Sequence, residues 1–126
     1  MTFPDTTLIS TLNMPVTEIQ DTSHFWKVME ENEVVIVETY AEWDKPGAAM
    51  RPRFERLSEE EDCNKSGILF VRLNVDNLAD LSKSLGVTAM PTYIAFHKRE
   101  HYGRIVGAKT RDVEELVWDT IGCMDG

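Results

Sequence analysis

Two strongly apolar runs with a helix-length segment between them limit the folds open to this chain. Val34–Val37 and Ile68–Val75 are too apolar for exposed edge strands and are typical of strands buried inside a sheet. Parallel strands need a crossover of a dozen or more residues between them, and the intervening segment is long enough to supply one. The sequence therefore predicts a strand, a helix and a strand joined by a right-handed crossover.

The segment between the runs has helical periodicity. Met50, Phe54 and Leu57 recur at i, i+4 and i+7, which predicts a helix from about Pro46 to Glu61 with one apolar face. Pro52 lies inside this helix, and a proline there removes a backbone hydrogen bond. We therefore expect a kink at Pro52.

Shorter signals complete the predicted order of elements as βαβαβαββα. A parallel start and an antiparallel end predict an α/β fold with a central mixed sheet flanked by helices on both faces. The further expected elements are a strand near Val16, a short helix capped by Asp21 or Ser23, a helix carrying Leu78, Leu81 and Leu85 and stopped by Gly86, a hairpin of Thr92–Phe96 and Tyr102–Val106 across Lys98–Glu100, and a last helix from Thr110.

The chain has the length of one domain, at 126 residues against a usual ~100–150. Its 42% hydrophobic content is enough to fill one core. We expect an N-terminal arm over residues 1–15, a single domain over 16–122 and a C-terminal tail over 123–126.

Charge and composition exclude several classes of partner. The formal charge of −9 repels nucleic acid and acidic membrane surfaces, so neither partner is expected. No stretch approaches the ~18 apolar residues of a membrane span, and the N-terminus lacks the pattern of a secretory signal. Cys63 and Cys123 lack the spacing of a disulfide framework or a zinc site, and no phosphate-binding loop occurs. A cytoplasmic protein without metal or other cofactor is expected.

Four separated motifs carry a resemblance to a known family. They are Tyr40-Ala41-Glu42-Trp43 at the end of a strand, Pro52 inside the following helix, Met90-Pro91-Thr92, and Val106-Gly107-Ala108. Together with the order of elements they make residues 16–122 resemble thioredoxin. The resemblance implies a thioredoxin-like fold in one domain, with a cis peptide bond before Pro91.

The family's redox motif, Trp-Cys-Gly-Pro-Cys, reads Trp43-Asp44-Lys45-Pro46-Gly47 in this chain. A dithiol reductase needs one reactive thiolate and a second thiol that resolves the mixed disulfide. Asp44 and Gly47 supply neither, and Cys63 and Cys123 lie outside the motif. No catalytic residue for dithiol exchange is expected.

Asp44 has two interpretations. A carboxylate directly before a helix can accept hydrogen bonds from its first backbone N–H groups, which makes Asp44 an N-cap. It can also hold a fixed negative charge where the resemblance places the reactive thiolate of the family.

Glu38 likewise has two interpretations. The resemblance matches it to the family's buried acid and matches Arg72 to the basic partner of that acid. A buried carboxylate is costly unless it is paired, so a Glu38–Arg72 ion pair is expected. If the pair were open to the groove, Glu38 could act as a general base.

The resemblance also implies a groove that holds extended peptides by backbone hydrogen bonds next to the cis-proline loop, and such binding needs no cysteine. We therefore expect a redox-inactive protein that acts as an adaptor or regulator by binding a protein or peptide. The expected binding residues are Trp43, Lys45, Pro46, Met90, Pro91, Thr92 and Gly107. Simple inheritance of a packed loop remains the alternative for these residues.

Two other functions stay open. The first is a non-redox enzyme of isomerase or lyase type that uses Asp44 and Glu38 as acid and base. The second is a structural subunit whose dimer buries Trp43, Met90 and Pro91. In either of the non-enzymatic cases the chain is expected to be a monomer or a weak homodimer.

Overall fold

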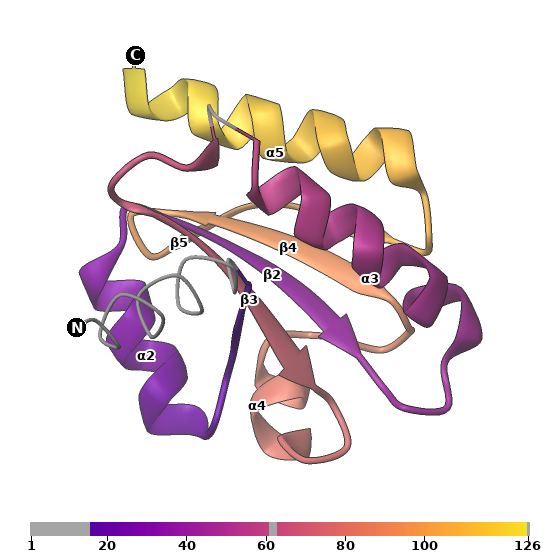
Figure 1. The fold of residues 1–126 in the computed structure, drawn as a ribbon. Helices are drawn as coiled ribbons and strands as arrows, with labels where there is room; N and C mark the ends of the chain where they lie inside the picture. The colour runs from indigo at the N-terminus through magenta and orange to yellow at the C-terminus, as the bar shows by residue number, and fades with distance from the viewer. Residues whose placement is uncertain (1–15, 61–62, 126) are drawn as a thin grey trace, which may run out of the picture.

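The computed structural model describes residues 16–60 and 63–125, and the expected arm over residues 1–15 lies outside them. Within the described residues the elements follow the predicted order βαβαβαββα (Figure 1). They are β1 (Val16–Glu18), α2 (Thr22–Glu31), β2 (Val34–Tyr40), α3 (Lys45–Ser58), β3 (Ile68–Asn74), α4 (Ala79–Ser84), β4 (Thr92–His97), β5 (Glu100–Val106) and α5 (Thr110–Asp125).

The strands form one mixed sheet in the order β1-β3-β2-β4-β5. β3 runs parallel to both β1 and β2, and β4 is antiparallel to β2 and β5. The expected parallel start and antiparallel end are therefore confirmed. In this register Glu38 of β2 lies directly between Arg72 of β3 and Tyr93 of β4.

Helices cover both faces of the sheet. Figure 1 shows α3 and α5 on one face and α2 and α4 on the other. Because successive strand residues point to opposite faces, β2 supplies Val34 and Ile36 to one core and Val35 and Val37 to the other. This explains why the first apolar run of the sequence has no polar residue.

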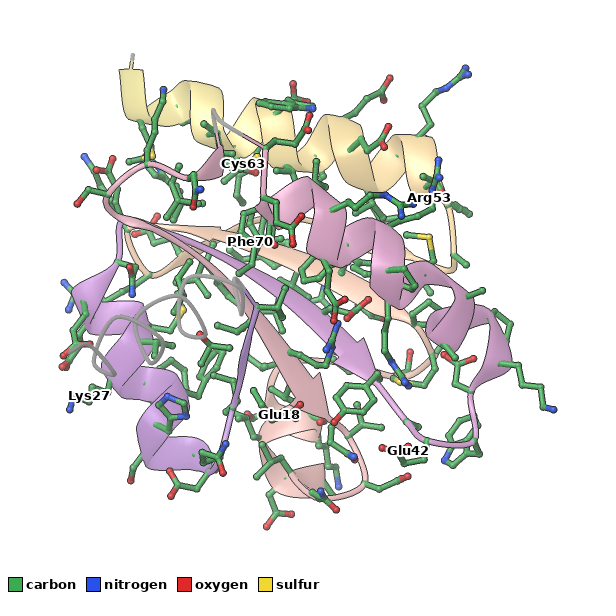
Figure 2. All side chains as sticks on the ribbon, viewed as in Figure 1. Glu18, Lys27, Glu42, Arg53, Cys63 and Phe70 are labelled. Carbon is green, nitrogen blue, oxygen red and sulfur yellow. The ribbon has the colours of Figure 1, made fainter. Side chains whose placement is uncertain are left out.

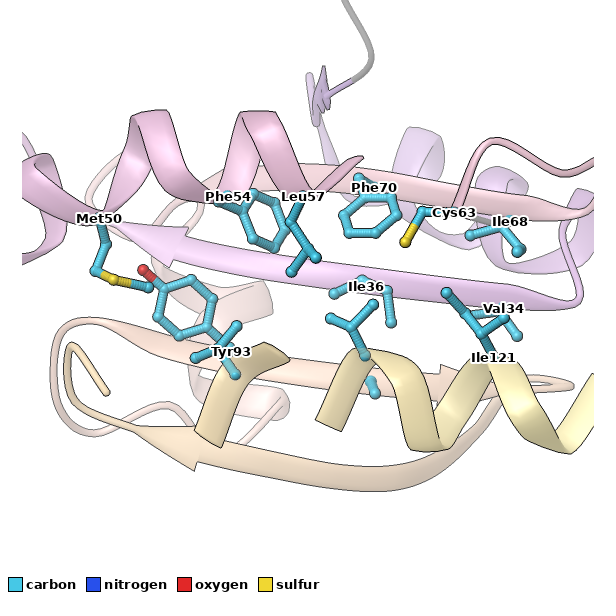
Figure 3. Close-up of a cluster of buried hydrophobic side chains, with 13 residues drawn as sticks. Val34, Ile36, Met50, Phe54, Leu57, Cys63, Ile68, Phe70, Tyr93 and Ile121 are labelled. Carbon is cyan, nitrogen blue, oxygen red and sulfur yellow. The ribbon is translucent and has the colours of Figure 1, made fainter. Parts of the chain in front are cut away.

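The core beneath α3 and α5 is built around aromatic rings. Phe54 of α3 lies 5.4 Å from the ring of Phe70 and 5.6 Å from that of Tyr93. Figure 3 shows this cluster between the helices and the sheet. Its buried members are Val34, Ile36, Met50, Phe54, Leu57, Cys63, Ile68, Phe70, Tyr93, Ala95, Val113, Val117 and Ile121.

Two helices end at different places from those predicted. α3 ends at Ser58 instead of Glu61, where the backbone N–H of Glu59 donates to the Arg56 carbonyl and that of Glu60 donates to the Leu57 carbonyl. Acidic residues are unfavourable at the negative end of a helix dipole, which is consistent with an earlier end. α5 extends to Asp125, so the expected tail continues the helix. Met124 packs partly buried against the first core, which stabilises this last turn.

Smaller local features also follow from named contacts. Asp21, and not Ser23, caps α2, because its Oδ1 accepts from the backbone N–H of His24 at 2.7 Å. The loop of the hairpin consists of Lys98 and Arg99, which both have positive φ. This loop is one residue shorter than the predicted Lys98–Glu100. None of the helices in residues 16–60 and 63–125 is long and apolar enough to cross a membrane.

Candidate functional site

The residues of the degenerate motif lie where β2 ends and α3 begins. Residues 41–44 form the connecting loop and include Glu42, Trp43 and Asp44, and the loop before β4 carries Met90 and Pro91. Figure 2 shows Glu42 before the N-terminal end of α3, and Cys63 beyond its C-terminal end. Figure 3 places Cys63 in the core beside Phe70. The cysteine is therefore at the wrong end of α3 to replace a thiol of the motif.

Asp44 occupies the N-cap position of α3, but its side chain makes no capping hydrogen bond. The prediction that its carboxylate caps the helix is therefore wrong. The side chain is turned inward and only 5% exposed, and its Oδ2 has no hydrogen-bond partner among the described residues. A capping carboxylate was expected because Asp is a frequent N-cap residue. The side chain instead fills a space next to residue 47.

That space exists because residue 47 is a glycine. A Cβ at Gly47 would overlap Oδ2 of Asp44 and approach its Cγ to 3.1 Å. The Asp44 carboxylate thus occupies the volume that any side chain at position 47 would need. The two replacements in the motif are coupled, because the buried position of one requires the absence of a side chain at the other.

Glu38 lies beneath this part of α3 and is 1% exposed. The Nε of Arg72 donates to its Oε1 at 2.9 Å, and the Tyr93 hydroxyl donates to its Oε2 at 3.2 Å. Arg72 also pairs with Glu55 of α3 at 3.1 Å. The expected Glu38–Arg72 pair is confirmed. It links the central strand β2 to β3, and the Tyr93 hydrogen bond links β2 to β4.

Burial controls the ionisation of this cluster. Burial raises the pKa of the Glu38 carboxyl above its ordinary value, although the charge and hydrogen bond of Arg72 and the Tyr93 hydroxyl act in the opposite direction. Burial, followed by the negative charge of Glu38, also raises the pKa of the Tyr93 phenol. Both shifts favour the neutral forms of groups that have little access to water.

The loop around Pro91 is fixed on one side and open on the other. The Met90–Pro91 peptide bond is cis, and the carbonyl of Pro91 accepts from the N–H of Gly107 at 2.7 Å. Thr92 is 1% exposed and donates its hydroxyl to the Ala89 carbonyl, so it supports the loop from inside. The backbone N–H and C=O of Met90 bond to no group within the described part of the chain.

Exposed side chains surround this open backbone. Trp43 is 66% exposed, and its indole N–H donates to Oδ2 of Asp76 at 3.1 Å, which fixes the ring at the surface. Lys45 and Pro46 are exposed on the first turn of α3. Of the expected binding residues, Trp43 and Met90 border one cavity, whereas Pro91 and Thr92 are buried.

Sequence reasoning missed the other walls of that cavity. It has a volume of about 270 Å³ and is lined by Trp43, Val75, Ala79, Ser82, Lys83, Val87, Thr88, Ala89 and Met90. Ser82 lies in the helix that the spacing of Leu78, Leu81 and Leu85 predicts. A serine beside those leucines was the only signal in the sequence. Among the described residues, no group of three or more His, Cys, Asp or Glu side chains is placed to hold a metal ion.

Comparisons with known proteins agree with this fold. A family model described as thioredoxin matches residues 15–118. Thioredoxin-1 of Schizosaccharomyces pombe is 30% identical over 81% of this chain and 95% of its own length, and thioredoxin H2 of Arabidopsis thaliana is 32% identical over 75% and 68%. The crystal structure of reduced Schistosoma mansoni thioredoxin superposes with a TM-score of 0.74 at 30% identity, covering 83% of this chain and 97% of that one.

The fit between Asp44 and Gly47 predicts coupling between the two positions in a double-mutant cycle. Gly47→Ala in the wild type should give a lower free energy of unfolding than the change it brings in an Asp44→Ala background would predict, because the new Cβ must displace the Asp44 carboxylate. In an Asp44→Ala background the same substitution should raise it by about 0.5–1 kcal/mol, since alanine favours a helix over glycine. Urea denaturation of the four proteins measures both effects. Equal effects in both backgrounds would contradict the coupling.

The raised pKa of Glu38 predicts how stability depends on pH. Above the ordinary value of 4.5 the folded state binds more protons than the unfolded state, so the contribution of Glu38 to stability falls as pH rises through its raised pKa. The free energy of unfolding of the wild type minus that of Glu38→Gln should therefore become more negative as pH rises above 4.5. Denaturation at several pH values tests this, with Glu30→Gln at an exposed position of α2 as the control. A difference that grows more positive would show the opposite pKa shift.

Proposed function

The chain belongs to the thioredoxin family, and we propose that it acts by binding protein or peptide segments and not by dithiol exchange. The absence of dithiol exchange is proposed on chemical grounds. Exchange needs an attacking thiolate and a resolving thiol, and the two positions of the motif carry a carboxylate and a glycine. The two cysteines of the chain lie outside the motif: Cys63 is a core residue and Cys123 belongs to α5.

The observation that carries the proposal is the unpaired backbone of Met90. An extended segment can add to such a position as a short strand, with backbone hydrogen bonds for affinity and side-chain pockets for specificity. The hydrogen bond from the Gly107 N–H to the Pro91 carbonyl, at 2.7 Å, keeps this loop in place beside β5. Trp43 supplies an exposed aromatic surface next to it. A binding protein of this kind serves as an adaptor or regulator, and we assign it to the cytoplasm because its cysteines lack the spacing of a disulfide framework.

The unpartnered Oδ2 of Asp44 favours a second candidate, a non-redox enzyme with Asp44 and Glu38 as acid and base. Glu38 is the weaker half of that pair, because both its oxygens already accept hydrogen bonds and its side chain is buried. A structural dimer that buries Trp43 is the third candidate. Sedimentation over a range of concentrations separates a weak homodimer from a monomer.

The wild-type protein should not accelerate the reduction of insulin by dithiothreitol in a turbidity assay. The physical reason is the absence of a thiol pair at the start of α3. Alkylation of Cys63 and Cys123 should leave the result unchanged. A rate above that of a protein-free control, lost on alkylation, would contradict redox inactivity.

The double variant Asp44→Cys/Gly47→Cys is the positive control of that assay. Once the Asp44 carboxylate is gone, a Cβ at position 47 lies 3.5 Å from the Cβ of Pro91, which is an ordinary contact. Thiols at these positions stand at the N-terminus of a helix, which lowers the pKa of the first one. The variant should form a disulfide and reduce insulin, and Glu38→Ala in that background should slow turnover. A folded variant that forms no disulfide in oxidising glutathione would show that the site has been rebuilt, and would favour the enzyme.

Affinity capture from a native lysate tests the binding function directly. Trp43→Glu places a charge beside the Met90 backbone and should reduce recovery of bound proteins by about tenfold, the effect of losing one central aromatic residue of an interface. Trp26→Glu is the matched control, because Trp26 is 47% exposed on α2, away from the loop of Pro91. Quantitative mass spectrometry gives the recovery. Equal losses in the two variants would remove the support for this groove.

A further inference from the structure

β5 lies at the edge of the sheet, since β4 is its only neighbour among the strands of residues 16–60 and 63–125. The Gly107 N–H donates to the Pro91 carbonyl toward β4, and residues of an antiparallel strand alternate between facing their partner strand and facing away from it. The backbone N–H and C=O groups of Val106 and Arg104 therefore point away from β4. No hydrogen bond to these outward groups occurs within the described part of the chain.

Cations gather at both ends of this open edge. Five of the 13 lysine and arginine residues fall within residues 98–111, beside only one acidic residue, although the whole chain carries −9. Lys98 and Arg99 form the turn before β5, and they are the first cation pair. Lys109 and Arg111 lie after β5 at the start of α5, and they are the second cation pair. All four side chains are exposed, and none forms an ion pair with a described carboxylate.

The fold itself does not account for the second cation pair. The N-terminus of a helix is the positive end of its dipole, so Lys109 and Arg111 are unfavourably placed at the start of α5. Arg104 is different, because its guanidinium donates to the carbonyls of Leu85 and Gly86 at 2.8 and 3.2 Å and so holds the chain after α4. The two cation pairs have no such structural role and remain available to a partner.

Charge selects among the strands that could add to this edge. Antiparallel pairing with β5 of a second copy would bring the first cation pair of each copy against the second cation pair of the other, and opposed like charges are unfavourable. A nucleic acid has no peptide groups to pair with the edge, and the charge of −9 repels it. An acidic polypeptide strand has both the complementary charge and the complementary backbone.

The dimensions of the edge limit the length of its partner. β5 has seven residues, so it is about 23 Å long at about 3.3 Å per residue. A segment of about nine residues would span it and reach both cation pairs. Between these ends, Tyr102 and Val106 are exposed. Aromatic and β-branched side chains pair favourably across strands, so β-branched residues suit the middle of the segment.

We propose that the outer edge of β5 is a second binding site, which takes an acidic polypeptide segment as an added strand of the sheet. The backbone of the segment pairs with the outward groups of Arg104 and Val106, and acidic residues at its ends lie beside the two cation pairs. The site does not depend on the groove at Met90. Val106 lies at the groove end of β5, and the first cation pair lies at the opposite end.

An NMR titration of the ¹⁵N-labelled full-length protein with capped peptides tests this site. The acidic peptide is Glu-Asp-Thr-Val-Thr-Val-Thr-Asp-Glu, and its neutral match has Gln for Glu and Asn for Asp. The acidic peptide should bind about tenfold more tightly than the neutral one, the combined effect of several exposed ion pairs. The largest amide shifts should occur at Arg104 and Val106.

A third peptide separates strand addition from simple attraction of charge. It keeps the acidic ends but has Pro-Pro-Pro in place of the central Val-Thr-Val. Proline has no backbone N–H, so this peptide cannot complete the hydrogen bonds of an added strand. It should bind about tenfold more weakly than the acidic peptide.

Two double variants make a matched pair for the titration. Lys109→Gln/Arg111→Gln removes the second cation pair and should weaken binding of the acidic peptide about fivefold. Arg53→Gln/Arg56→Gln makes the same change of net charge at exposed positions of α3 and should leave the affinity unchanged. Loss of two cations from the start of α5 relieves an unfavourable interaction with the helix dipole. The first variant should therefore unfold at the wild-type temperature or above it, so its weaker binding has no origin in unfolding.

Each alternative predicts a different result. Equal affinity for the acidic and neutral peptides, or equal weakening in the two double variants, would overturn the acidic partner. Undiminished binding of the proline peptide would overturn strand addition. Tighter binding of a single-stranded oligothymidine would assign the cations to nucleic acid, and a shift of the Val106 amide on dilution of the protein alone would assign the edge to a second copy.

The position of the shifts separates this site from the proposed groove. Largest shifts at Met90 would place the peptide in the groove and overturn the site on β5, while leaving the groove intact. No shift at Arg104 or Val106 with any of the peptides would also overturn the site on β5. The binding function of the groove is tested separately by the capture experiment with Trp43→Glu.

Discussion

The buried carboxylate of Glu38 is the constraint around which this end of the molecule is organised. It lies on the central strand, 1% exposed, and a carboxylate in that position requires partners on both oxygens. The register of the sheet supplies them, because Arg72 and Tyr93 stand opposite Glu38 on the two neighbouring strands. Arg72 then reaches Glu55 on α3. One ionic cluster thus joins three strands to the helix that begins at the degenerate motif.

In the motif, the two residues that replace the cysteines fit one another. Gly47 leaves a space, and the Asp44 carboxylate fills it. The adjacent loop keeps an open backbone at Met90 and an exposed ring at Trp43. The proposed binding of an extended segment rests on these two features.

The parts of the site that follow from strand register could be predicted, and those that follow from side-chain volume could not. The Glu38–Arg72 pair was predictable, because the resemblance matches these residues to the family's buried acid and its basic partner, and a buried carboxylate needs a partner. The inward turn of Asp44 was not, because helix-capping statistics describe the local backbone and take no account of space left by a glycine three positions later. Ser82 was missed for a similar reason. Its place on the cavity wall depends on how other segments pack around α4.

The sequence by itself determined the α/β class, the order of elements, the mixed sheet and the absence of a cysteine pair from the motif. These depend on periodicity and residue identity, which are local properties. Tertiary structure alone decided where α3 and α5 end, which way the Asp44 carboxylate points, and that Trp43, Ser82 and Met90 share one cavity. The physical reason is that burial, unpaired polar atoms and cavity volume arise between segments far apart in the chain. Such quantities are set by packing in three dimensions, and no local pattern encodes them.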